Sequence, residues 1–382
     1  MKPLNAGRWP TYSPACRRDV ERLLRAGGSL TAYRSNPDHP KSPAEGSWAR
    51  RLEVLAERTF GVRHAVATSS GTTALQAMLY ASGLARGSTI LTSPYTFSAT
   101  PAAIIHAGMR PVFGDVNPET YCLDPGSAIG ITWDAVMPVD LFGRVAFRGW
   151  HGMILADSCQ AAGAYRWMAQ ALAAVFSFNG QKNVPAGEAG LLITDDWTVA
   201  DRARGFVSHG ENWGGSDVGM NGRLNELTAC VAYHGLKALP WNNETRRRLA
   251  RELWRRLNDE KRLHILSPMD IAHHALYVYP FTVADGVDRT GFVRRLKKLG
   301  VEAGEGYIRP ILSKYEAFRD AVRGPLPVAE DLSERSLVLL LQVRPPATIG
   351  HMRYISLAIR SALDGGKVKH RTRMGHVEAT AF

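Results

Sequence analysis

The sequence predicts an α/β fold, with a large domain built on a mostly parallel central sheet and a smaller C-terminal α+β domain. Two observations carry this prediction. From about residue 46, short apolar runs of strand length alternate with helix-compatible stretches, as in a parallel sheet covered by helices. Near residues 239–241 this alternation ends and a long helical pattern follows. The chain has 382 residues, 45% of them hydrophobic, which is enough for two domains in one globular unit.

The large domain is predicted to begin with a helix whose apolar stripe runs from Trp48 to Phe60 and stops at Gly61. A strand over residues 64–68 then leads through a small polar loop into an apolar helix. Further strands are predicted over 89–92, 111–116, 135–139, 153–156, 174–178 and 191–194, with a helix over 98–106.

The smaller domain is predicted from the change in pattern at Pro240, which we expect to break the chain. Residues 242–258 have the pattern of a long Arg-rich helix with leucines on one face. A strand over 276–283 and helices over 289–299 and 352–363 follow. The predicted domains are an N-terminal arm (1–25), the large domain (26–240), the small domain (241–364) and a basic, flexible tail (365–382).

Composition narrows the class of protein. Lys and Arg number 47 against 35 Asp and Glu, a net charge of +12 that favours anionic partners. No apolar stretch approaches the about 20 residues needed to cross a bilayer, and no signal peptide is recognisable, so we expect a soluble cytoplasmic protein. The four cysteines are scattered, which argues against a disulfide framework and a structural zinc site.

The first segment with chemical meaning is Thr68-Ser69-Ser70-Gly71-Thr72-Thr73, which joins a predicted strand to a predicted helix. Free backbone N–H groups at a helix start, beside hydroxyl donors, form an anion site that suits phosphate. An ordinary helix N-cap explains the same residues, because Ser and Thr are common there in any helix.

Two more segments follow strands of the same predicted sheet. Asp157 comes directly after an apolar strand, where ligands bind in open α/β sheets, although an Asp there often only caps a turn. Lys182 lies in a polar loop between two apolar strands. Most lysines are solvated surface charges, but an amine held near a bound phosphate can form an imine with a carbonyl.

The order phosphate loop, carboxylate, lysine is more specific than any one of these segments. Pyridoxal 5'-phosphate needs all three: an anion site, an acid at its ring nitrogen and a Schiff-base lysine. The chain here resembles the DegT/DnrJ/EryC1/StrS family of sugar aminotransferases, which have the fold-type I architecture of aspartate aminotransferase. The resemblance also covers Pro94-Tyr95-Thr96-Phe97-Ser98-Ala99-Thr100, Pro111-Val112-Phe113-Gly114-Asp115-Val116 and Asn221-Gly222-Arg223-Leu224-Asn225-Glu226.

The resemblance implies a role for each matching residue. Lys182 matches the Schiff-base lysine and Asp157 the carboxylate at the pyridine nitrogen; these two are the expected catalytic residues. The other expected cofactor-binding residues are Gly71, Thr72 and Ser177 at the phosphate, Phe97 stacked on the ring, Gln160 at the ring oxygen, and Asn221, which in the family reaches the phosphate of the neighbouring subunit. This last role implies a homodimer with shared active sites. No metal is expected.

Three departures from the family pattern concern other positions. Ala189 stands where the family usually has glycine, Asp140 stands at a usual histidine, and Leu339-Leu340-Leu341-Gln342 replaces a Leu-Pro pattern. The last two lie where sugar specificity is often set, so they bear on the substrate and leave the cofactor prediction intact. Dehydratases of the family have histidine in place of the lysine, so Lys182 favours transamination.

The resemblance implies an aminotransferase that moves an amino group from L-glutamate or L-glutamine to a keto sugar by a ping-pong mechanism. We expect a nucleotide-linked acceptor, with Arg309 as a candidate phosphate contact, although an Arg there is more often solvated. Arg8-Trp9-Pro10 resembles the start of relatives that aminate keto cyclitols, which is the second hypothesis.

Two hypotheses come from other classes of function. Some family members are thought to be regulators that bind the cofactor without turnover. Six arginines between residues 246 and 256, with the basic tail, suggest nucleic-acid binding, but such a face is usually only solvated and no DNA-binding motif accompanies it.

Overall fold

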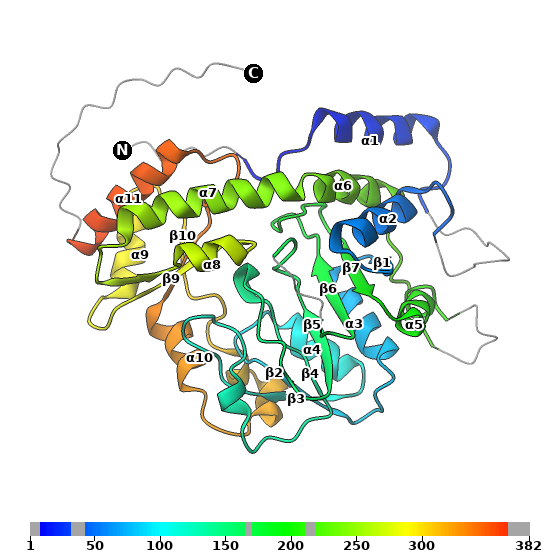
Figure 1. Ribbon diagram of the computed structural model, residues 1–382, viewed down its shortest axis with the longest axis horizontal. Helices are drawn as coiled ribbons and strands as arrows, with labels where there is room; N and C mark the ends of the chain where they lie inside the picture. The colour runs from blue at the N-terminus through cyan, green and yellow to red at the C-terminus, as the bar shows by residue number, and fades with distance from the viewer. Residues whose placement is uncertain (1–7, 32–42, 165–169, 211–217, 366–382) are drawn as a thin grey trace.

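A seven-stranded sheet forms the centre of the molecule, in the strand order β1-β7-β6-β5-β4-β2-β3. The computed structural model describes residues 8–31, 43–164, 170–210 and 218–365 (Figure 1). The strands are β1 (His64–Thr68), β2 (Thr89–Thr92), β3 (Arg110–Phe113), β4 (Ala135–Val136), β5 (Met153–Asp157), β6 (Ala173–Ser177) and β7 (Gly190–Thr194). The pairs from β6 across to β3 are parallel, whereas β7 is antiparallel to β1 and β6. The predicted α/β class with a mostly parallel sheet is confirmed.

Helices cover both faces of this sheet, so its strands are apolar on both sides. Along β1, Val66 packs with the helix α3 (Gly71–Ala81), whereas Ala65 and Ala67 pack on the opposite face with α2 (Trp48–Phe60). The face with α3 also holds α4 (Ala99–His106) and α5 (Trp197–Val207), and the face with α2 also holds α6 (Glu226–Lys237). The layering leaves the carboxyl ends of the parallel strands as an edge where loops meet.

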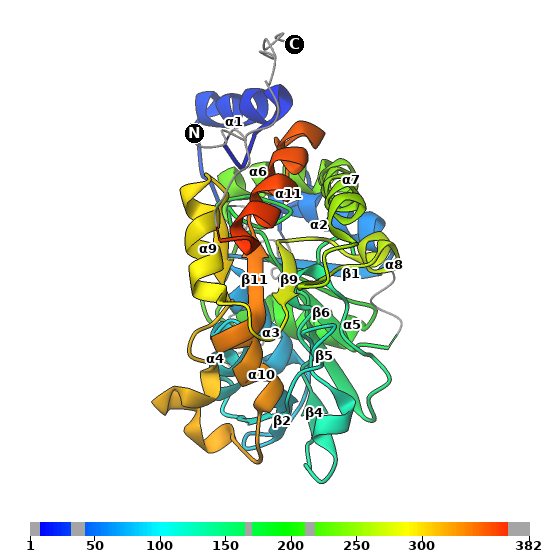
Figure 2. The same cartoon turned by 90° about the vertical axis from the view of Figure 1, so that its left-hand side faces the viewer.

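A second, antiparallel sheet has the order β10-β11-β9-β8 and lies in the C-terminal part of the chain (Figure 2). Its strands are β8 (Leu263–Ile265), β9 (Tyr279–Val283), β10 (Ala303–Glu305) and β11 (Leu337–Leu340), and its neighbouring helices are α7 (Leu239–Leu257), α8 (Pro268–His273), α9 (Arg289–Lys298), α10 (Pro327–Asp331) and α11 (Ile349–Leu363). Apolar side chains of α7, α9 and α11 share one core with β9 and β11. The boundary proposed at residue 240 stays a prediction.

Two predictions about this second part were wrong in detail. Pro240 does not break the chain: it lies in the first turn of α7, where the absent N–H is not needed, and the break between α6 and α7 is at Ala238. The predicted strand 276–283 starts only at Tyr279, because Leu276 has a positive φ of 54° and the backbone bends there. On either side of Leu276, the N–H of Ala275 donates to the carbonyl of Gly143 and that of Tyr277 donates to the carbonyl of Phe142.

The N-terminal arm contains a helix that sequence inspection missed, α1 (Pro14–Ala26). Ser13 caps it by accepting a hydrogen bond from the backbone N–H of Cys16, and Pro14 suits its first turn. Asp19 of α1 pairs with His234 of α6 at 2.9 Å, and α1 lies along α6 in both ribbon views (Figures 1 and 2). Within the described ranges, no helix has the length and apolarity needed to span a membrane. The predicted tail from residue 366 onward lies outside the described residues.

Candidate functional site

Asp157 is the last residue of β5, and its carboxylate is buried, with 4% of the residue exposed. Thr100 Oγ1 donates a hydrogen bond of 2.7 Å to Oδ2, and the backbone N–H of Cys159 donates one of 3.2 Å to Oδ1. Burial raises the pKa of Asp157, while these hydrogen bonds and the positive charge of Lys182 act in the opposite direction. The charge of Lys182 thus acts on the Asp157 carboxylate, although the two side chains do not form a direct ion pair.

Lys182 lies in the loop after β6 and is half-buried. Its backbone N–H donates to the carbonyl of Asn179 at 2.8 Å, and its Nζ lies 4.1 Å from the centroid of the Tyr277 ring. The next residue, Asn183, is buried and donates from Nδ2 to the carbonyl of Ala275 at 2.7 Å. These contacts hold the lysine beside the bend that precedes β9.

The polar loop between β1 and α3 forms a tight cradle at the start of α3. Ser70 caps the helix by accepting a hydrogen bond from the N–H of Thr73. A Cβ added at Gly71 would lie 2.8 Å from Cβ of Ser177 and 3.1 Å from Sγ of Cys159. Three predicted segments thus meet at Gly71, because the loops after β5 and β6 reach the start of α3.

Replacing Gly71 by alanine is expected to weaken binding of a phosphate-bearing cofactor about tenfold or more, because the added methyl group displaces Ser177. Titration of the protein with pyridoxal phosphate, followed by fluorescence, measures the change. Gly324→Ala is the matched control, since a Cβ at that glycine meets nothing within 4 Å. Equal affinity in Gly71→Ala would argue against a phosphate site in this cradle.

The other predicted cofactor residues lie around this centre. Phe97 is 55% exposed, three residues before Thr100, so it is not a core residue. Thr72 is exposed at the start of α3. Gln160 is buried, accepts from the N–H of Phe142 and donates to the hydroxyl of Tyr307, both at 2.9 Å. Asn221 is exposed.

Asn221 lies beside the loop between β1 and α3, because its neighbour Gly222 contacts that loop. The carbonyl of Gly222 accepts a hydrogen bond of 2.8 Å from the N–H of Ser69, and a Cβ at Gly222 would meet Thr73 at 2.5 Å. Asn221 therefore lies next to the candidate phosphate loop of its own chain. Its contact with a neighbouring subunit stays a prediction.

Asp140, which stands at the family's histidine position, is fully buried behind Asp157. Its carboxylate accepts two hydrogen bonds from Nη2 of Arg148, at 2.7 and 2.8 Å, and one of 2.5 Å from Oγ of Ser158. The backbone N–H of Asp140 donates to the carbonyl of Asp157. The Asp140 carboxylate is therefore already paired with groups of the protein. Ala189, another of the three departures, is buried in the core with Phe176.

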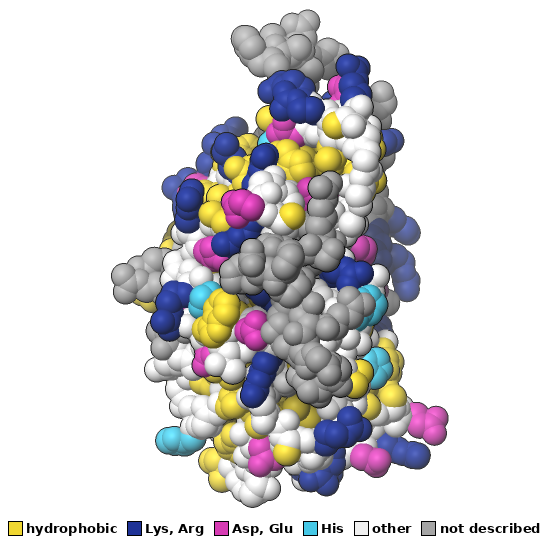
Figure 3. All heavy atoms as spheres, turned by 90° about the vertical axis from the view of Figure 1, so that its right-hand side faces the viewer, with side chains coloured by type: hydrophobic (Ala, Val, Ile, Leu, Met, Phe, Trp, Pro, Cys, Tyr) yellow, Lys and Arg dark blue, Asp and Glu magenta, His cyan; other side chains and the backbone are white. Residues whose placement is uncertain are grey.

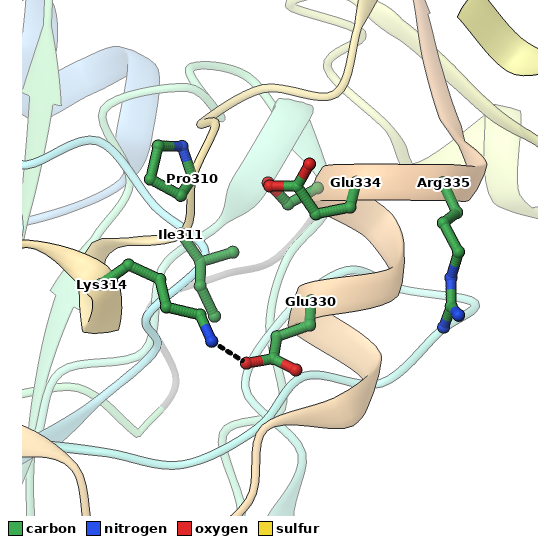
Figure 4. A pocket seen from close by; sticks show the side chains of 7 residues that line it. Pro310, Ile311, Lys314, Glu330, Glu334 and Arg335 are labelled. Carbon is green, nitrogen blue, oxygen red and sulfur yellow. Dashed lines mark ion pairs between the residues drawn. The ribbon is translucent and has the colours of Figure 1, made fainter.

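Arg309 is 48% exposed in its side chain and is already paired with two carboxylates, Glu334 at 2.9 Å and Glu305 at 3.3 Å. This pairing counts against Arg309 as a free phosphate contact. Figure 4 shows the neighbouring pocket of about 270 Å³, across which Lys314 and Glu330 form an ion pair of 2.6 Å. The residues that line this pocket include none of the predicted cofactor residues.

The arginines of α7 do not form a free basic face. Arg246 is fully buried. Arg247 and Arg251 pair with Glu244, Arg255 and Arg256 pair with Glu252, and Arg248 is exposed. On the face drawn in Figure 3, basic side chains are likewise separated by acidic and apolar ones. The pairing removes the main argument for nucleic-acid binding.

Sequence inspection did not connect four residues with Lys182 and Asp157. Thr100 lies within a motif that was recognised, but nothing in its spacing shows that it reaches Asp157. Tyr277, Arg246 and Arg344 come from the second part of the chain, and only the bend before β9 brings Tyr277 onto Lys182. No short-range signal could have identified these long-range contacts.

Comparison with known proteins places the chain among aminotransferases. Residues 40–359 match the model of the DegT/DnrJ/EryC1/StrS aminotransferase family. The chain is 29% identical over 327 residues to 3-oxo-glucose-6-phosphate:glutamate aminotransferase of Bacillus subtilis, covering 80% of this chain and 73% of the relative. It is 28% identical over 316 residues to the pleiotropic regulatory protein of Geobacillus stearothermophilus, covering 77% and 84%.

A third relative bears on the cyclitol hypothesis. The putative L-glutamine:3-amino-2,3-dideoxy-scyllo-inosose aminotransferase of Streptoalloteichus tenebrarius is 32% identical over 190 residues, covering 44% of this chain and 46% of that protein. Among solved structures, DesI in the presence of its TDP-sugar product is similar with a TM-score of 0.83 and 25% identity, covering 96% of this chain and 95% of DesI.

Proposed function

Since the chain belongs to the DegT/DnrJ/EryC1/StrS aminotransferase family and is an aminotransferase, we propose that it moves an amino group from L-glutamate or L-glutamine to a nucleotide-linked keto sugar, with pyridoxal phosphate held at Lys182. The observation that carries this proposal is that the positive charge of Lys182 acts on the buried Asp157, beside the Gly71 cradle. These groups suit the three parts of the cofactor: an aldehyde, a ring nitrogen and a phosphate.

Different residues would bind different parts of the cofactor. The N–H groups at the start of α3, with Thr72 and Ser177, would hold the phosphate, because a helix N-terminus attracts an anion. Phe97, exposed beside Thr100, would stack on the ring. Gln160 keeps one amide hydrogen beyond its bond to Tyr307, and that hydrogen would be donated to the ring oxygen. Asn221 would serve the phosphate of a partner subunit, so we propose a homodimer.

Two side chains would do the chemistry. When bound, pyridoxal phosphate supplies an aldehyde that condenses with amines and a ring that accepts electrons from the α carbon of the donor. Lys182 Nζ would take the proton from that α carbon and return a proton to the acceptor carbon. Asp157 would keep a proton on the ring nitrogen through a buried ion pair, which Thr100 orients by its hydrogen bond.

The acceptor is proposed from the names of relatives. A keto sugar is favoured by the 3-oxo-glucose-6-phosphate aminotransferase and by DesI with its TDP-sugar product. A keto cyclitol is the second candidate, supported by the scyllo-inosose aminotransferase and by the N-terminal Trp9-Pro10. Arg309 is not proposed as the contact for a nucleotide phosphate, because its charge is already paired with Glu305 and Glu334.

A two-step assay tests the proposed function. The protein saturated with pyridoxal phosphate is mixed with L-glutamate or L-glutamine, and loss of the visible absorbance is expected as the cofactor takes up the amino group. Keto sugars and keto cyclitols are then added in turn, and the correct acceptor restores the absorbance. A protein whose absorbance persists with both donors would instead be a regulator that binds the cofactor without turnover.

A further inference from the structure

Two arginines meet on one tryptophan ring beside the candidate active site. The guanidinium carbon of Arg246 lies 5.0 Å from the Trp9 ring centroid, and that of Arg344 lies 5.9 Å from it. Throughout the part of the chain that the structure describes, neither arginine forms an ion pair with a carboxylate. This distinguishes them from the arginines of α7 that pair with Glu244 and Glu252.

Arg246 is the more constrained of the two, because it is fully buried. Its Nη1 donates to the carbonyls of Leu276 (2.8 Å) and Tyr277 (3.1 Å), but Nε and Nη2 have no partner, and neither has the buried Nε1 of Trp9. Burial, and then the charge of Arg344, lower the pKa of Arg246 to about 9, so it is still a cation at neutral pH. Unsatisfied buried cationic donors of this kind call for an anion.

Each arginine is connected to Lys182 through one intervening residue, which is Gln181 for Arg344 and Tyr277 for Arg246. Nη1 of Arg344 donates to Oε1 of Gln181 at 3.1 Å, and Gln181 directly precedes Lys182. On the other side, Tyr277 accepts from Arg246 through its carbonyl and places its ring 4.1 Å from Lys182 Nζ. Arg344, Tyr277 and Lys182 are all partly exposed, and Arg344 is hydrogen-bonded to the residue that directly precedes the lysine.

We propose that Arg344, supported by Arg246 across the Trp9 ring, binds a carboxylate of the amino donor. This inference rests on the proposed function. The donor nitrogen must react where Lys182 does, and the α-carboxylate is attached to the same carbon as that nitrogen, so a carboxylate site belongs close to the lysine. The phosphate of a sugar acceptor is separated from the reacting carbonyl by several more bonds. The planar guanidinium also matches a carboxylate in shape and charge.

The test compares Arg344→Gln with Arg248→Gln, a control that replaces an exposed arginine of α7. Glutarate is the probe, because it carries two carboxylates and no amine to react. Calorimetry on the full chain saturated with pyridoxal phosphate is expected to show glutarate binding that weakens roughly 10- to 100-fold in Arg344→Gln and is unchanged in Arg248→Gln. The KM for L-glutamate should rise by a similar factor, while the KM for the acceptor stays the same.

Several outcomes would overturn the assignment. The first is an absence of glutarate binding by the unsubstituted protein, and the second is equal glutarate binding by Arg344→Gln. The third is that Arg344→Gln loses affinity for inorganic phosphate and not for glutarate, which would assign the site to the acceptor. Arg246→Met is a second variant: if it folds, it should weaken glutarate binding as well. Turnover of L-glutamate with an unchanged KM in Arg344→Gln would refute this inference alone and leave the proposed aminotransfer intact.

Discussion

Replacing Lys182 by alanine is expected to abolish amino transfer, with a loss of at least about 10²- to 10⁴-fold in kcat. The side chain is proposed both to hold the cofactor covalently and to move the proton at the substrate carbon, and no described neighbour offers a second amine beside Asp157 and Tyr277. The bound cofactor should therefore lose its visible absorbance in the variant. Absorption spectra and single-turnover assays with L-glutamate measure the two effects.

Lys297→Ala is the matched control for this experiment, because Lys297 is an exposed lysine on α9. It should keep both the spectrum and the rate. A Lys182→Ala protein with an unchanged spectrum would remove Lys182 from the mechanism. Retained absorbance in both variants would point to non-covalent binding of the cofactor.

Replacing Asp157 by asparagine is expected to lower kcat by about 10²- to 10³-fold while the visible absorbance persists. Asparagine keeps the shape of the side chain and can still accept from Thr100, but it carries no charge to hold the proton on the ring nitrogen. Lys182 remains available to bind the aldehyde. Thr100→Val gives a milder comparison, since it removes one hydrogen bond and leaves the carboxylate. Full activity in Asp157→Asn would contradict the proposed role.

Asp157→Asn is expected to lower kcat but not to lower the stability of the protein without cofactor. Burial raises the pKa of Asp157 in the folded chain above the ordinary value of 3.8. The stability that this carboxyl contributes is fully present below the unfolded pKa and is lost as the pH rises through the folded pKa. Asp157→Asn should therefore match or exceed the Tm of the parent at pH 7, and this difference should shrink toward pH 4. Thermal melts across that range measure it, and a lower Tm at pH 7 would contradict it.

The strands and the three chemical segments could be predicted from the sequence because their signals are local. A short apolar run indicates a buried strand from its own residues alone, and the cofactor segments were recognised by short patterns that contain Asp157, Lys182 and Gly71. The structure brings these segments together at one edge of the central sheet. The roles of the individual residues stay predictions until the variants are measured.

Other expectations failed because they depended on contacts that no local pattern encodes. Pro240 was expected to break the chain, yet it starts α7. Arg309 was a candidate phosphate contact, yet Glu305 and Glu334 fold back onto it. The basic face of α7, which the sequence already indicated to be usually only solvated, loses Arg246 to the core.

The fold class, the family and the types of residue at the strand ends follow from the amino-acid sequence, because periodicity and short motifs act over a few neighbours along the chain. Which distant groups share a site follows from the packing of the whole chain. Tyr277 reaches Lys182, Arg148 neutralises Asp140, and Arg344 joins Arg246 on Trp9, across sequence separations that only packing closes. The physical reason is that burial and charge pairing depend on the positions of whole elements.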